Sequence, residues 1–442
     1  MSSPIPGYRT LIRLAIPVIL ANAAVPLLGL ADTAVIGRTG DAAALGAIAL
    51  GSLVFSFLYW GFGFLRMGTT GFTAQAAGAG DMPEVRAAFA RALLMGLAIG
   101  LGLILLQWPL RLGALSLLNG SDAVELGVQQ YFQVRIWGAP ATLGMFALLG
   151  VLIGLGHTRQ LLWLQLFLNG LNLSLDILFV AGFGWGVRGI ALGTVIAEWT
   201  SLALGLWMVL RLVRPAPGDT APLWPWALLK VRALWWRTLR ANADIMWRTL
   251  LLLAGFALFA DQGARFGDDT LAANHILLQF ISLSAFFLDG YAYVVESQVG
   301  RAMGARQPLW FRLVIVRSTV LAAATALVLA LLVWLPGPWF IDMLTTAAGV
   351  RETARLYLPW AAVYVLCSFA AFQLDGIFIG TTTSRPMRDA TGASLLLFML
   401  ALWLLVPLYG NHGLWLAFIG FVVVRGLTLG AFLPLLYRRV QR

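Results

Sequence analysis

Two apolar stretches of this sequence contain carboxylates that could carry a proton or a small cation. Asp32 lies in VPLLGLADTAVIG (25–37), and Asp176 lies in LFLNGLNLSLDILFV (166–180) together with Asn169 and Asn172. The spacings of three and four residues place Asn169, Asn172 and Asp176 on one face of a helix. A carboxylate with a carboxamide one turn away can hold a proton or a small cation. The alternative is a hydrogen-bonded clamp between helices.

Further polar side chains occur in other apolar segments. Thr194 and Glu198 are four residues apart and share a helix face, although threonine often bonds only its own helix backbone. For the remaining candidates, a structural ion pair or an interfacial position competes with a role in lining or gating a transport path. These residues are Arg66, Asp289, Tyr293, Glu296 and Asp375, and Asn169 and Glu198 are further candidates for polar lining or gating.

Two of the acids could form a proton-driven switch. Pro26 and Gly29 favour an irregular helix around Asp32, which is tolerated at membrane depth where it lines protein or a water-filled cavity. The alternative for Asp32 is an interfacial position near the external mouth. Desolvation disfavours the charged form of a carboxyl group, and a second carboxylate nearby disfavours it further. If Asp32 and Asp176 approach each other, they could share a proton whose loss favours a wetter, more open arrangement.

The composition predicts the membrane in which these acids would sit. Of 442 residues, 60% are hydrophobic and 11% are charged, whereas a soluble domain carries roughly a quarter charged residues. Stretches such as STVLAAATALVLALLVWL (318–335) approach or exceed the roughly 18 apolar residues that span a bilayer. No small-residue cleavage site follows the first apolar segment, so we expect a spanning helix there.

Glycine, proline and charge clusters divide the chain into about twelve spanning segments. We therefore expect an all-α polytopic membrane protein with an N-lobe at 1–215, a cytoplasmic linker at 216–237 and a C-lobe at 238–442. The expected spans lie near 10–36, 45–77, 87–107, 124–153, 160–182, 188–210, 238–261, 271–300, 313–335, 354–380, 389–408 and 412–436.

Alternating the loops between the two sides places most of the arginine on one side. The positive-inside rule makes that side cytoplasmic, together with both termini. The net charge of +11 is therefore interpreted as loop charge that sets topology, and no nucleic-acid partner is expected. The predicted location is a cytoplasmic membrane, and the family resemblance described below implies a bacterial one.

The two halves resemble each other at an offset of about 226 residues, which indicates an internal duplication. An even number of helices separates equivalent points, so the copies have the same orientation, and such transporters place their sites near mid-membrane. The matching pairs are IGLGHTR (153–159) with IGTTTSR (379–385), GAGD (78–81) with GARQ (304–307), TGDAAALGAIAL (39–50) with FGDDTLAANHILL (266–278), and GVRGIALG (186–193) with GNHGLWLA (410–417).

Enzyme signatures are missing from the sequence. There is no phosphate-binding P-loop, HExxH or GxSxG motif, and one cysteine, Cys367, cannot form an intrachain disulfide. The histidines, His157, His275 and His412, lie far apart. We expect no enzyme, no resident metal and no cofactor.

The chain resembles the multidrug and toxic compound extrusion (MATE) family, and more closely its DinF-like branch. The stretches that carry the resemblance are VPLLGLADTAVIG, FLRMGTTGFTAQAAGAGD, NLSLDILFV, GVRGIALGTVIAEW, LDGYAYVVES and LDGIFIGTTTSRPMR. The resemblance implies two six-helix lobes that open alternately to each side and export amphipathic, often cationic compounds. It also implies a coupling site in the N-lobe at Asp32, Asn172, Asp176 and Thr194.

The NorM-like branch of that family instead uses acids on helices 7 and 10 of the C-lobe for sodium. This chain has no Glu within helix 7, and Asp375 lies near the cytoplasmic end of helix 10. The resemblance therefore favours proton coupling through the N-lobe, while the same oxygens of Asp32, Asn172, Asp176 and Thr194 could hold Na+.

The expected function is a proton-coupled multidrug antiporter that works as a monomer in the lipid bilayer. Four alternatives stay open: a sodium-coupled antiporter at the same site, a flippase for a lipid-linked precursor, a membrane-embedded transferase, and a channel. A flippase would need a large cationic cavity, for which Arg66 and Arg248 are few.

Overall fold

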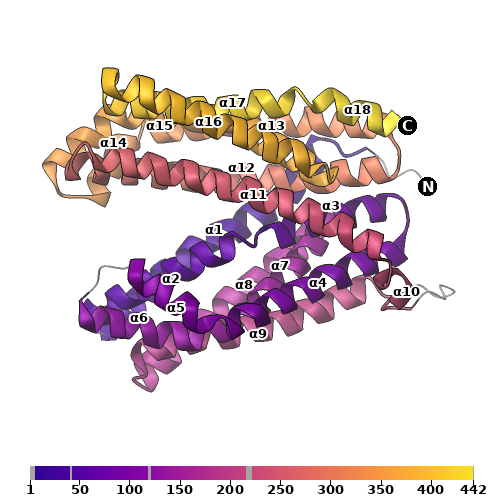
Figure 1. The fold of residues 1–442 in the computed structure, drawn as a ribbon, viewed down its shortest axis with the longest axis horizontal. Helices are drawn as coiled ribbons and strands as arrows, with labels where there is room; N and C mark the ends of the chain where they lie inside the picture. The colour runs from indigo at the N-terminus through magenta and orange to yellow at the C-terminus, as the bar shows by residue number, and fades with distance from the viewer. Residues whose placement is uncertain (1–4, 40–41, 118–120, 216–221, 442) are drawn as a thin grey trace. The chain divides into compact units, whose positions relative to one another are not determined.

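A computed structural model describes residues 5–39, 42–117, 121–215 and 222–441. For residues 25–39, 42 and 117 it describes only the backbone. No β-strand occurs in these ranges, and the helices run side by side within each half of the chain (Figure 1).

The chain is built of long helices joined by short turns. Their order is α1 (Tyr8–Thr39), α2 (Ala42–Trp60), α3 (Phe64–Gly78), α4 (Met82–Leu105), α5 (Gln107–Leu117), α6 (Asp122–Arg135), the 3-10 turn η1 (Ile136–Gly138), α7 (Ala139–Gly154), α8 (Thr158–Asp176), the π-helical turn η2 (Ile177–Gly182), α9 (Gly186–Leu212), α10 (Trp226–Leu229), α11 (Arg232–Ala264), α12 (Asp268–Gly304), α13 (Pro308–Trp334), α14 (Gly337–Leu344), α15 (Ala348–Gly380), α16 (Ser384–Tyr409), α17 (Asn411–Gly430) and α18 (Leu433–Gln441).

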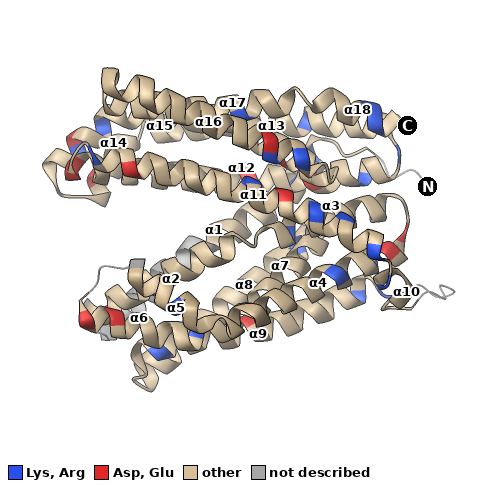
Figure 2. Ribbon diagram, in the orientation of Figure 1, with Lys and Arg blue, Asp and Glu red and all other residues tan. Residues whose placement is uncertain are grey.

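The helices have the length and composition of membrane spans. Among the described residues, eleven stretches are long and apolar enough to cross a bilayer, from Ala43–Gly78 to Asn411–Gln441. Most of the ribbon carries no charge, as Figure 2 shows. Backbone groups in hydrocarbon must be hydrogen-bonded internally, which a helix achieves by itself. The predicted all-α membrane fold is confirmed.

The chain divides into two compact units. Unit 1 comprises Met1–Ile19 and Arg240–Arg442, and unit 2 comprises Leu20–Leu239. The start of α1 joins unit 1 because Leu11 and Ala15 pack with Tyr291 and Val294 of α12 in one buried cluster.

Helix packing inside the two units follows the predicted duplication. In unit 2, α3 packs on α4 and α7, α7 packs on α9, and α8 packs on α9. In unit 1, α12 packs on α13 and α15, α15 packs on α17, and α16 packs on α17. The same pairs therefore meet in each copy, although α12 and α15 are continuous where their counterparts are broken into α2–α3 and α6–η1–α7.

Two equivalent helix crossings depend on paired glycines. A methyl group on Gly154 of α7 would lie 2.8 Å from the carbonyl oxygen of Thr70 in α3. The counterpart in unit 1 is Gly380 of α15, which lies against the carbonyl of Glu296 in α12. Small residues let membrane helices approach this closely, and both crossings use a G-x-x-x-G spacing, GVLIG (150–154) and GIFIG (376–380).

The turns that follow these elements are equivalent as well. Gly80 has φ 73° and Arg306, 226 residues later, has φ 51°. Gly156 has φ 71° and Thr382, again 226 residues later, has φ 51°. Glycine adopts this left-handed conformation without steric penalty, whereas Arg306 and Thr382 hold it with a side chain present.

Both described ends of the chain lie beside α13 in unit 1. A guanidinium nitrogen of Arg317 donates a 2.8 Å hydrogen bond to the carbonyl of Pro6, just before α1. Near the other end, the ring of Tyr437 in α18 meets that of Phe311 edge-on at 5.5 Å. Arg317 and Phe311 both lie in the N-terminal part of α13. The start of α1 and the end of α18 therefore lie at the same end of unit 1.

Candidate functional site

The predicted polar face of α8 is buried in unit 2. Asn172 is 1% exposed and Asp176 is fully buried, one turn apart as their spacing requires. Asn169, one turn earlier, has a buried amide nitrogen with no hydrogen-bond partner in the described part of the chain. The three residues thus form a continuous polar strip on a membrane-spanning helix.

A hydrogen bond connects this strip to α9. The amide nitrogen of Asn172 donates to the hydroxyl oxygen of Thr194 at 3.2 Å, and that hydroxyl donates to the carbonyl of Ile190 at 3.0 Å. The amide oxygen of Asn172 is buried and accepts no hydrogen bond from any described residue. The structure therefore brings together Asn172 and Thr194, which are 22 residues apart in sequence.

The local backbone creates room for the carboxylate of Asp176. Gly193 of α9 lies so close that an added methyl group would clash with Oδ1 of Asp176. Asp176 ends the regular part of α8, and the π-helical turn η2 follows it directly. Phe179 in this turn stacks on Phe183, the residue after it, and also on Trp185 at 5.0 Å. Such π-turns are frequent at functional sites.

Asp32 lies on α1, but its side chain is outside the described residues. Its predicted approach to Asp176 stays a prediction.

Glu198 lies in a buried ion pair with Arg135 of α6. Two guanidinium nitrogens of Arg135 donate to the two carboxylate oxygens at 2.7 and 2.5 Å. The cation also sits over the rings of Phe55 and Tyr59 at 5.4 and 5.3 Å, and Gly138 leaves space beside the pair. This geometry gives Glu198 a structural partner that the sequence analysis did not identify.

A second ionic cluster is buried in unit 1. The carboxylate of Asp375 in α15 binds the guanidinium of Arg248 in α11, and a nitrogen of Arg425 in α17 lies 3.9 Å from the same oxygen. All three side chains are at least nine-tenths buried. The sequence analysis missed both Arg425 and Arg135. Arg425 is the single charge of the apolar helix α17, which is the signal that pointed to the acids. Arg135 shares α6 with Asp122 and Glu125, so its helix gave no such signal.

The other candidates lie on helices close to the glycine crossings. Arg66 is buried on α3, near Thr70. Glu296 is buried on α12, and Asp289 and Tyr293, each about one turn further back, are partly buried. Each of these four residues has an interaction partner.

The described residues contain no group of three or more His, Cys, Asp or Glu side chains that could hold a metal ion. The oxygens of Asn172, Asp176 and Thr194 are instead suited to a proton or a monovalent cation, because they supply one carboxylate and neutral ligands.

Comparison with known proteins points to one class. The sequence model of the MatE family matches residues 17–178 and 250–404. The chain is 38% identical to DNA damage-inducible protein F of Escherichia coli (strain K12), over 96% of this chain and 91% of that protein. It is 29% identical to the probable multidrug resistance protein NorM of Deinococcus radiodurans, over 96% and 95%.

Solved structures share the fold. A multidrug resistance MATE family transporter of the MOP superfamily, in an outward-facing conformation, matches with a TM-score of 0.86 at 18% identity, covering 98% of this chain and 96% of that one. The Vibrio cholerae MATE transporter VcmN in the bent form matches with a TM-score of 0.83 at 20% identity, covering 98% and 97%.

Proposed function

The chain belongs to the MatE family of multidrug efflux transporters, and we propose that it exports amphipathic, often cationic compounds in exchange for protons. The proton would be carried by Asp176 and Asp32, with Asn172 and Thr194 as their polar surroundings. The proposal includes a functional monomer in the bacterial cytoplasmic membrane with both termini on the cytoplasmic side.

The observation that carries the proposal is the full burial of Asp176 beside the Asn172–Thr194 hydrogen bond. An ionised carboxylate in such a place is unfavourable, so binding of a proton removes charge at membrane depth. The carboxylate occupies the space that a side chain at position 193 would need, so it is closely packed against α9. A change of protonation would therefore change the packing of α8 against α9, which is how a proton can bias one conformation over another.

The ionic cluster of unit 1 supports coupling through unit 2. Asp375 already binds the guanidinium of Arg248, which is a permanent cation attached to the chain. A sodium ion would have to displace this guanidinium to reach the carboxylate. We therefore expect no coupling ion at Asp375.

Sodium at the unit 2 site is the second candidate. The buried amide oxygen of Asn172 accepts no hydrogen bond from a described residue, and such an oxygen is a suitable ligand for a hard cation. With the carboxylate of Asp176 and the hydroxyl of Thr194 it would provide three kinds of oxygen ligand.

The test is substrate-induced proton flux in proteoliposomes with an imposed pH gradient and no sodium. Lipophilic cations such as ethidium and tetraphenylphosphonium would be added to the wild type, Asp32→Asn and Asp176→Asn. Asp261→Asn is the matched control, because Asp261 is 60% exposed and pairs with Arg265 in the turn directly after α11. We expect flux in the wild type and the control and no flux in the other two variants.

Other results would redirect the proposal. Flux that requires sodium would make the same oxygens sodium ligands. Normal flux in both Asp32→Asn and Asp176→Asn would overturn the coupling site. Absence of any flux, together with translocation of a fluorescent lipid, would favour a flippase.

A further inference from the structure

A surface depression of about 450 Å³ lies where the start of α16 meets α18 in unit 1. Its lining combines three charged side chains, three hydroxyls and three apolar residues. They are Thr382, Thr383, Ser384, Arg385, Pro386, Asp389, Phe432, Leu435 and Arg439. None of these residues belongs to the proposed coupling site.

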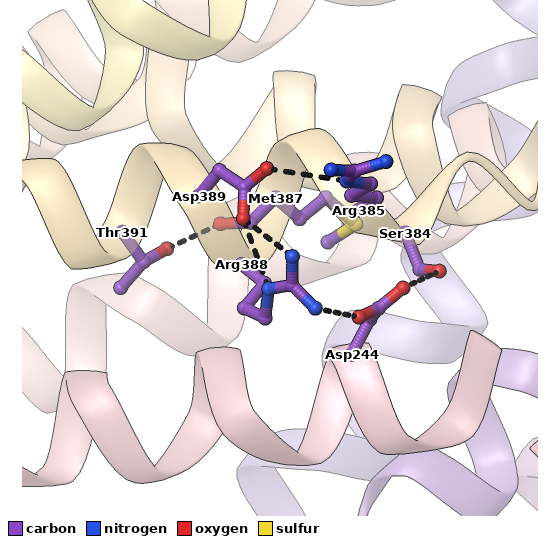
Figure 3. Close-up of polar contacts among 7 residues, drawn as sticks. All are labelled: Asp244, Ser384, Arg385, Met387, Arg388, Asp389 and Thr391. Carbon is purple, nitrogen blue, oxygen red and sulfur yellow. Dashed lines mark hydrogen bonds and ion pairs between the residues drawn. The ribbon is translucent and has the colours of Figure 1, made fainter. Parts of the chain in front are cut away.

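The charges around the depression are unevenly balanced. Next to the depression, Asp244, Arg385, Arg388 and Asp389 form a charged cluster (Figure 3). Arg388 donates hydrogen bonds to both acids, to Asp389 at 2.9 and 2.8 Å and to Asp244 at 2.7 Å. Ser384 gives Asp244 a further hydrogen bond at 3.0 Å. Arg385 reaches Asp389 only at 3.7 Å, and its side chain is 80% exposed. Arg385 therefore has the longest contact with an opposite charge among the charged residues of this cluster.

The second cation of the depression comes from α18. A guanidinium nitrogen of Arg439 donates to the hydroxyl of Thr383 at 3.1 Å, which directs this side chain toward the start of α16. Arg439 forms no ion pair with any described residue, and Arg438 precedes it in the last turn of the helix. The lining therefore has one positive charge more than its single aspartate balances.

Apolar side chains border these cations. Phe432, just before α18, and Leu435 in α18 are each 41% exposed, whereas Leu436 and Val440 of α18 are buried against the protein. The edge-on contact of Tyr437 with Phe311 holds α18 to α13. One face of α18 is thus fixed to the unit, and the depression has an exposed apolar border next to guanidinium groups.

We propose that this depression binds the headgroup of an anionic phospholipid, with the phosphate on Arg385 and Arg439 and an acyl chain along Phe432 and Leu435. Guanidinium groups bind phosphate by charge-assisted hydrogen bonds, and basic pockets beside spanning helices are suited to lipid headgroups. A soluble phosphate compound would use the same cations but would leave the apolar border exposed.

The internal duplication provides a matched control. Arg159 of unit 2 stands 226 residues before Arg385, is exposed, and follows the equivalent turn. The counterpart of Arg439 is Val213, which is buried. A single exposed arginine at the same helix start, without its partner, should not make a lipid site.

The experiment measures lipid binding to delipidated full-length protein by native mass spectrometry. The probes are dioleoyl phosphatidylglycerol, dioleoyl phosphatidylcholine and inorganic phosphate. We expect phosphatidylglycerol to bind the wild type and Arg159→Gln equally, and to bind the double variant Arg385→Gln/Arg439→Gln roughly tenfold more weakly. Arg385→Lys/Arg439→Lys should retain most of the affinity.

Three outcomes would overturn the proposal. These are equal phosphatidylglycerol affinity in the wild type and the double variant, equal binding of phosphatidylcholine and phosphatidylglycerol, or displacement of the lipid by inorganic phosphate at similar concentration. If the double variant does not fold, the single variant Arg385→Gln tests the proposal. It should fold, because the exposed side chain of Arg385 contacts Asp389 only at 3.7 Å. That single variant should still bind severalfold more weakly, and unchanged binding would contradict the assignment.

Discussion

Arg135 holds both carboxylate oxygens of Glu198 with two hydrogen bonds, at 2.7 and 2.5 Å, between α6 and α9 of unit 2. The two residues are 63 positions apart, and both are buried. From a buried pair with this geometry we expect a structural role for Glu198, in contrast to the coupling role that we propose for Asp176.

Glu198→Gln should therefore destabilise the protein without specifically uncoupling it. Removing one partner of a buried ion pair leaves an uncompensated charge and costs about 3–5 kcal/mol. Thermal unfolding in detergent would show this loss, and Arg135→Met/Glu198→Leu should recover much of it because both charges are gone. A Glu198→Gln variant that unfolds like the wild type but has lost proton-coupled efflux would contradict the structural role.

Gly193→Ala should impair coupling through Asp176. The added methyl group would clash with Oδ1 of Asp176 and would lie 3.3 Å from Cβ of Leu175. Overpacking of this kind costs about 1–3 kcal/mol, and here the strain falls on the carboxylate. We expect reduced proton flux per folded molecule in the proteoliposome assay. Gly170→Ala in α8 is the control, because nothing lies within 4 Å of its added methyl group. Equal flux in both variants would argue against a tight site.

Arg248→Gln should destabilise unit 1 because Asp375 loses its close cation. The nearest remaining guanidinium, on Arg425, lies 3.9 Å away, so the buried carboxylate would be poorly compensated. We expect a loss of about 3 kcal/mol or more. Arg248→Gln/Asp375→Asn should restore part of it, as a double-mutant cycle of unfolding would measure. Additive effects of the two single changes would mean that the pair does not interact.

Gly154→Ala and Gly380→Ala should each weaken a helix crossing. An added methyl group on Gly154 would lie 2.8 Å from the carbonyl oxygen of Thr70, and the equivalent group on Gly380 would clash with the carbonyl of Glu296. Backbone atoms cannot move aside as side chains can, so we expect a loss of about 1–3 kcal/mol at each site. Gly420→Ala in α17 is the control, since its added methyl group meets nothing within 4 Å. The measurement is thermal unfolding of the three variants. Equal melting temperatures for all three would contradict the close approach of the helices at the two crossings.

Arg306→Gly should stabilise the protein slightly. Arg306 has φ 51° in a turn whose counterpart in the first copy, Gly80, is a glycine. Removing the side chain relieves the steric cost of this conformation, while glycine gains freedom in the unfolded chain. The net gain in the free energy of unfolding is about 0.5–1 kcal/mol. Gln307→Gly, next to it at φ −112°, has no such strain and should destabilise. The two melting temperatures should therefore move in opposite directions, and a lower melting temperature for Arg306→Gly would refute the argument.

The sequence by itself determined the class of the protein. Long apolar runs predicted spanning helices because a helix satisfies its own backbone in lipid. The offset of about 226 residues predicted equivalent turns, and Gly80 with Arg306 and Gly156 with Thr382 share their conformations. The helical period also placed Asn172 and Asp176 on one face, because side-chain direction along a helix depends only on spacing.

Only the tertiary structure decided which polar groups are partners. Helical period tells which residues share a face but not which other helix that face meets. The sequence therefore indicates no partner for Glu198, and the structure places Arg135 opposite it. It likewise places Arg248 and Arg425, which are 127 and 50 positions away, beside Asp375. The depression that we propose as a lipid site likewise exists only because α18 folds back on the start of α16. Packing between distant segments sets these distances, and no local spacing encodes them.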